Sequence, residues 1–63
     1  MYVVFRNDWR LDRYIDFHDV VSIEYKNGYY IMDCKDRTKR MVDGIQYRLV
    51  EMRCESNGRM EDN

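Results

Sequence analysis

The segment VVSIEYKNGYYIMDC, residues 20–34, constrains the fold of this chain more than any other. Two runs rich in β-branched and aromatic residues flank Asn27-Gly28, and an Asn-Gly pair between such runs is typical of a two-residue hairpin turn. A type I′ turn needs a positive φ at both central positions, which asparagine tolerates and glycine adopts without steric cost. The segment therefore predicts a β-hairpin. Its second strand is apolar on both faces from Tyr29 to Met32, as expected in the centre of a sheet.

Strand patterns also occur before the hairpin turn. Residues 2–5, YVVF, are β-branched or aromatic and predict the first strand of the sheet. Val21, Ile23 and Tyr25 alternate with polar residues. Side chains on a strand point to opposite faces in turn, so this alternation predicts that the three share a buried face.

The second half of the chain predicts two more strands. Residues 38–42 are shorter and charged, and they end at the Asp-Gly pair 43–44, which favours a second hairpin turn. Apolar residues then alternate with polar ones over 45–49, but the alternation slips by one position between Leu49 and Val50. Such a slip predicts a β-bulge there, or the end of the strand.

The segment 8–17 fits two structures. At helical spacing, Leu11, Tyr14 and Ile15 share one face, whereas at period two Leu11, Ile15 and Phe17 do. The neighbouring strand-like residues favour the extended form. We therefore expect a mainly β domain over residues 1–54, an antiparallel meander of four or five strands that forms a small barrel or an open sheet. The alternative is an α+β fold with one short helix near residues 8–17.

The size of the chain limits its stability. A domain of 63 residues buries only about 60% of the surface of its unfolded chain, and such domains are often stabilised by disulfides, metals or association. We expect free thiols at Cys34 and Cys54 and a cytoplasmic location, because no signal-like start and no membrane-length apolar run is present. We expect association, with a larger protein or as a homodimer, to supply the stability that the small core lacks. The polar residues 55–63 predict a disordered tail.

The sequence offers no catalytic or metal-binding pattern. His18 is the single histidine, and neither it nor the two cysteines have the spacing of a zinc site or of a nucleophile–base pair. We therefore expect a protein that is not an enzyme and that has no cofactor and no metal.

Aromatic and basic residues carry the functional hypothesis. The candidate binding residues are three tyrosines near the first turn and four cations in the basic stretch that follows: Tyr25, Tyr29, Tyr30, Lys35, Arg37, Lys39 and Arg40. Such residues are enriched in protein–protein hot spots. They also bind single-stranded nucleic acid, with the rings stacked on the bases and the cations on the phosphates.

The charge of the whole chain favours a protein partner over nucleic acid. The 11 basic and 12 acidic residues leave it slightly acidic. We interpret it as an inhibitor or adaptor of a larger protein or protein–nucleic acid complex, a type that includes accessory proteins of viruses, phages and mobile elements. The alternative is a small nucleic-acid-binding β module. The acidic series Asp8, Asp12, Asp16 and Asp19 is a further candidate surface for a basic partner.

Overall fold

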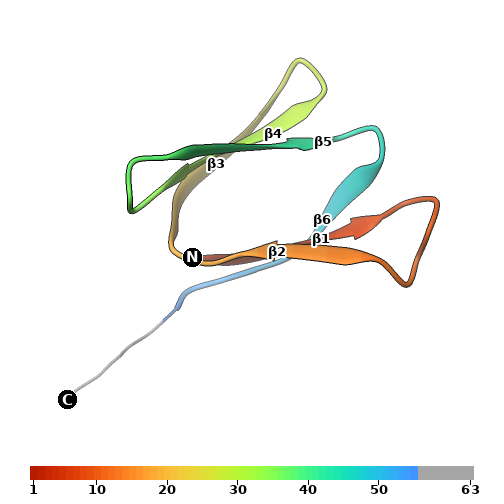
Figure 1. Cartoon of the computed structure of the whole chain (residues 1–63), viewed down its shortest axis with the longest axis horizontal. Coiled ribbons are helices and arrows are strands. Elements are labelled where there is room, and N and C mark those ends of the chain that lie inside the picture. Colours follow the sequence, from red (N-terminus) through yellow and green to blue (C-terminus); the bar gives the residue numbers. More distant parts are fainter. Residues whose placement is uncertain (56–63) are drawn as a thin grey trace.

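A computed structural model describes residues 1–55, which form six strands and no helix (Figure 1). The strands are β1 (Tyr2–Asn7), β2 (Tyr14–Phe17), β3 (Val20–Lys26), β4 (Tyr29–Cys34), β5 (Lys39–Asp43) and β6 (Tyr47–Arg53). All pairings are antiparallel and give two three-stranded sheets, β2-β1-β6 and β3-β4-β5. The predicted mainly β antiparallel fold is confirmed, with six strands in place of four or five. Residues 56–63 of the predicted tail lie outside the described residues.

The chain passes from one sheet to the other at His18-Asp19. Asp19 has a φ of 60°, and this left-handed residue bends one extended run into β2 and β3. Strands that switch sheets in this way form the corners of two-layer β folds. Within residues 1–55 no helix is present, so none there is long and apolar enough to cross a membrane.

The helix considered for residues 8–17 is wrong, and only Tyr14–Phe17 is a strand. Residues 8–13 form a loop, because the side chain of Asn7 takes the backbone donors that a helix or strand would use otherwise. Its Oδ1 accepts the N–H groups of Trp9 and Arg10, both at 2.8 Å. Asparagine competes with regular structure by this kind of local hydrogen bond.

The predicted first hairpin is confirmed. Asn27 and Gly28 have φ angles of 53° and 85°, and β4 lies between β3 and β5 as expected for a central strand. The buried face expected from alternation in β3 is partly wrong. The register shifts between Val20 and Ser22, so Val20 is buried while Val21, the extra residue, is exposed.

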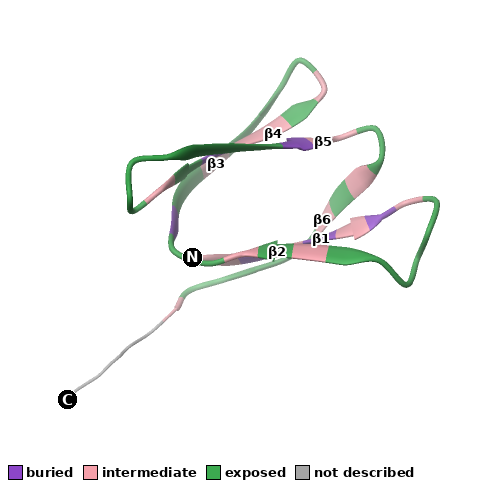
Figure 2. Cartoon of the chain, viewed as in Figure 1, coloured by how far each residue is buried: buried purple, intermediate pink, exposed green. Residues whose placement is uncertain are grey.

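The core lies between the two sheets. Its buried apolar side chains come from both sheets: Val3, Phe5, Val20, Met32 and Val42. Buried positions are purple in Figure 2. The Phe5 ring lies 5.1 Å from that of Tyr30 between centroids, and 6.1 Å from that of Phe17 at an edge-on angle of 78°. The contact with Tyr30 joins the two sheets through aromatic packing, and the contact with Phe17 lies within one sheet.

Two features of the second half depend on pairing with other strands. β1 pairs Val4 with Glu51 but Phe5 with Leu49, so Val50 is an extra residue and the predicted bulge is confirmed. The second hairpin expected at residues 43–44 is wrong, because β5 and β6 belong to different sheets.

Gly44 connects the two sheets instead of closing a hairpin turn. It is not at a positive φ, and its N–H donates to the carbonyl of Gly28 at 2.8 Å.

Candidate functional site

The three tyrosines predicted as binding residues occupy two faces of the sheet β3-β4-β5. Tyr25 and Tyr30 lie opposite each other on β3 and β4, with ring centroids 4.9 Å apart. Tyr30 packs on the core through Phe5, whereas Tyr25 is exposed. Tyr29 precedes Tyr30 by one position in β4, so its side chain is on the other face.

The four predicted cations lie at the opposite end of this sheet. Lys35 and Arg37 belong to the connection between β4 and β5, and Lys39 and Arg40 begin β5. The six residues of β4, which span about 17 Å at 3.3 Å per residue, separate Lys35 and Arg37 from the Asn27-Gly28 turn. Arg40 pairs with Met32 and so lies two positions along the sheet from Tyr30. The structure therefore spreads the predicted residues along the sheet, with Tyr25 and Tyr29 at the turn and Lys35 and Arg37 beyond the other end of β4.

Two of the cations are engaged by carboxylates. Lys39 Nζ lies 2.7 Å from Asp33 Oδ1, and Lys35 Nζ lies 3.9 Å from Asp19 Oδ1. The hydrogen bond from Lys39 holds the pKa of Asp33 below its ordinary value, and the same bond raises the pKa of Lys39. These side chains are solvent-exposed, so the pairs orient charge on the surface and add little stability.

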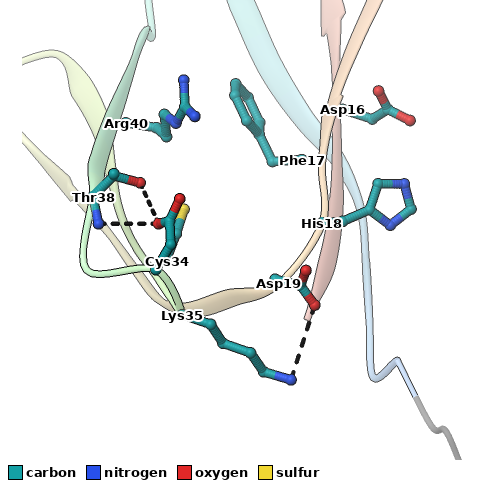
Figure 3. Close-up of a pocket in the computed structure, with 9 residues that line it drawn as sticks. Asp16, Phe17, His18, Asp19, Cys34, Lys35, Thr38 and Arg40 are labelled. Carbon is teal, nitrogen blue, oxygen red and sulfur yellow. Dashed lines mark hydrogen bonds and ion pairs between the residues drawn. The ribbon is translucent and has the colours of Figure 1, made fainter.

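An open cleft of about 540 Å³ lies between β2 and the connection from β4 to β5 (Figure 3). It is lined by side chains of both charges: Asp16, Phe17, His18, Asp19, Cys34, Lys35, Asp36, Thr38 and Arg40. Asp36 Oδ1 accepts the Thr38 N–H at 3.1 Å and the Thr38 hydroxyl at 2.5 Å. These two bonds hold the pKa of Asp36 below its ordinary value.

The cleft does not pair the cysteine with the histidine. In Figure 3 the imidazole of His18 points away from the opening, and its Nδ1 lies 3.0 Å from Glu55 Oε2. Among residues 1–55, no three His, Cys, Asp or Glu side chains gather as a metal site would require. The arrangement offers mixed charge and hydrogen-bonding groups without a nucleophile–base pair.

Many large apolar side chains are exposed on the described part of the chain. More large apolar side chains are exposed than buried: Trp9, Leu11, Tyr14, Val21, Tyr25, Tyr29, Met41, Ile45, Val50 and Met52. Single exposed apolar residues are ordinary, but a protein surface that gathers them often marks an interaction site.

Three of these residues lie around the segment 44–46, and we call them the apolar end: Trp9, Tyr25 and Ile45. The N–H of Asp8 donates to the carbonyl of Gln46 at 2.7 Å, so the loop that carries Trp9 begins beside this segment. The ring of Tyr25 lies against Gly44. Trp9 and Ile45 are 69% and 71% exposed.

Comparisons with family models, with curated proteins and with solved structures found no match to this chain. Its function therefore has to be argued from its own residues.

Of the three residues of the apolar end, only Tyr25 is among the binding residues predicted from the sequence, and Trp9 and Ile45 are not. Ile45 was assigned to the alternation of a strand, and Trp9 to a segment that fits either helix or strand. A local signal could have identified these two residues as exposed. Each apolar residue directly follows a turn-forming residue, Asp8 or Gly44, and an apolar residue within a turn has no core face to occupy.

Proposed function

We propose that this chain is a protein-binding module whose partner docks on the apolar end. The observation that carries this proposal is the exposure of Trp9, Tyr25 and Ile45 around one short segment. Tryptophan and tyrosine dominate the energetics of protein interfaces, because each buries a large area at a low entropic cost. In this proposal the chain acts as an inhibitor or adaptor, by covering a surface of a larger partner.

The distribution of charge supports a protein partner over nucleic acid. Single strands are bound by aromatic rings and free cations along one groove. Here the length of β4 separates Tyr25 from Lys35 and Arg37, and Lys35 and Lys39 are paired with carboxylates. The net charge of −1 also gives no general attraction to phosphate.

A capture experiment with matched variants tests the proposal. The full chain is immobilised, host lysate is passed over it with and without nuclease, and retained proteins are quantified by mass spectrometry. A Trp9→Ser, Ile45→Ser double variant alters the apolar end. A Val50→Thr, Met52→Gln double variant alters two exposed apolar residues of β6 and serves as the control.

We expect one protein to be retained after nuclease, to be lost with the first variant and to be kept with the second. Equal retention by both variants would move the interface away from the apolar end. Retention that disappears with nuclease, and falls steeply with salt, would favour the nucleic-acid alternative.

A further inference from the structure

β5 is the outer strand of its sheet, and no other strand among residues 1–55 pairs with its free edge. The hydrogen bonds to β4 fix which backbone groups face that edge. The N–H of Cys34 donates to the Thr38 carbonyl at 3.0 Å, and the N–H of Gly44 donates to the Gly28 carbonyl at 2.8 Å. Hydrogen-bonded positions alternate along an antiparallel strand, so the even-numbered residues of β5 bond to β4.

The odd-numbered residues Lys39, Met41 and Asp43 therefore direct their N–H and C=O groups away from β4. They pair with odd-numbered residues of β4, whereas the buried side chains of these two strands, Met32 and Val42, are at even positions. The side chains of Lys39, Met41 and Asp43 therefore share the outer face of the sheet. Met41, at the middle of the strand, is 60% exposed. Figure 2 shows much of this strand as exposed surface. An unpaired strand edge of this kind is a template for another strand.

We propose that the free edge of β5 pairs with β5 of a second copy of this chain, antiparallel and with the two-fold axis at Met41. In this register Met41 faces Met41 of the second copy, and Lys39 faces Asp43 of the second copy, twice by symmetry. Each facing pair has outward backbone groups and exchanges two hydrogen bonds. The strand KRMVD is thus complementary to itself when it is reversed.

Charge favours this register among the symmetric ones. An axis at Lys39, Arg40 or Asp43 places that residue opposite its own copy, and an axis at Val42 places Lys39 and Asp43 opposite uncharged residues. Like charges directly opposite each other destabilise a strand pair, whereas opposite charges stabilise it. With the axis at Met41, each charged side chain on the outer face meets the opposite sign.

The outer face of the sheet supports the same arrangement. Met41 lies beside Ile31, so the joined sheets would form an apolar row of Ile31 and Met41 from both copies. Lys39 already contacts Asp33 at 2.7 Å and would bridge it to Asp43 of the second copy. The same charges that discourage pairing with an arbitrary strand favour pairing with an identical one.

The expected dimer is weak. One five-residue strand pair buries far less than the roughly 1,600 Å² of a standard interface. Its population should therefore depend on concentration. The β5 edge adjoins the apolar end, because Asp43 Oδ1 accepts the N–H of Ile45 at 2.8 Å. The dimer uses the backbone of β5 and not the side chains of Trp9, Tyr25 and Ile45, so either proposal can fail without the other.

Sedimentation velocity over a dilution series of the full chain tests the dimer, with Met41→Pro as the edge variant. The N–H of Met41 faces solvent, so proline removes a donor needed by the second copy and none used by β4. We expect the native chain to shift from dimer to monomer on dilution, and Met41→Pro to be monomeric at every concentration with an unchanged circular dichroism spectrum. A monomeric native chain throughout, or a dimer that survives Met41→Pro, would overturn the proposal.

A charge exchange provides a test that a folding defect cannot imitate. Lys39→Asp and Asp43→Lys each create two like-charge contacts in the homodimer, and we expect the association constant to fall about tenfold or more. When the two single variants are mixed, both contacts again join opposite charges. Heterodimers should therefore form in the mixture. Failure of the mixture to associate better than either variant alone would reject this register.

Discussion

The ring of Tyr25 lies so close to Gly44 that a Cβ atom at this glycine would be 2.7 Å from Cε1 of Tyr25. It would also lie 2.8 Å from the carbonyl oxygen of Gly28. Side-chain carbon atoms do not approach other heavy atoms this closely, so position 44 accepts glycine alone without movement. The contact holds the crossing between the two sheets against the tip of the first hairpin.

We therefore expect Gly44→Ala to lower the free energy of unfolding by about 1–3 kcal/mol, the usual cost of overpacking. Denaturant unfolding followed by circular dichroism measures the change. Adding Tyr25→Ala should recover only part of the loss, because the Gly28 oxygen belongs to the backbone. Full recovery would mean that the glycine serves the tyrosine ring alone.

Gly28→Ala should destabilise the fold for a different reason. Nothing lies within 4 Å of a Cβ at this position, but its φ of 85° is strained for any residue with a side chain. The cost of a left-handed conformation is about 1–2 kcal/mol. Gly28→Asn is the matched variant, because asparagine tolerates positive φ, and its melting temperature should lie between those of alanine and glycine. Equal melting temperatures for all three would contradict the type I′ turn.

Asn7 positions the loop that presents Trp9. It is 6% exposed, and its Oδ1 accepts two backbone N–H groups. Asn7→Ala leaves both donors without this partner, so we expect a loss of about 1–2 kcal/mol in unfolding free energy and faster amide exchange in residues 8–13. Asn7→Asp keeps the acceptor oxygen and should preserve the protection of the loop. Unchanged exchange in the alanine variant would show that the loop is held by other contacts.

The sequence predicted those elements whose cause is local. The Asn27-Gly28 turn depends on its own two residues, and the slip in alternation at Leu49-Val50 marks an extra residue wherever the partner strand lies. The same applies to the strand character of β1 and β4, which follows from their β-branched and aromatic residues.

The errors concern residues whose role depends on contacts distant in sequence. Gly44 was interpreted as a turn glycine, yet it is required by the approach of Tyr25 from another strand. Val21 has the alternation of a buried residue, but the bend after Asp19 shifts the register and exposes it. The predicted binding residues are spread along the sheet, because the two ends of β4 are close in sequence but a strand length apart in space.

Glu55 links the end of the described chain to the bend between the sheets, and it predicts a pH dependence of stability. Its Oε1 accepts the N–H of Asp19 at 2.7 Å, its Oε2 lies 3.0 Å from His18, and the amino group of Met1 lies 3.6 Å away. The Asp19 hydrogen bond is the main reason, and the His18 bond the second, that the pKa of Glu55 is below its ordinary value of 4.5. Folding thus favours the charged carboxylate.

A pKa lowered by folding contributes stability that is present above the unfolded value and is lost as the pH falls through the folded value. We therefore expect Glu55→Gln to be less stable than the native chain at neutral pH, and the two unfolding curves to converge as the pH drops below about 4.5. The difference between them isolates Glu55 from Asp33 and Asp36, whose lowered pKa values act in the same direction in both proteins. A difference that stays constant from neutral to acid pH would show that Glu55 acts by packing and not by its charge.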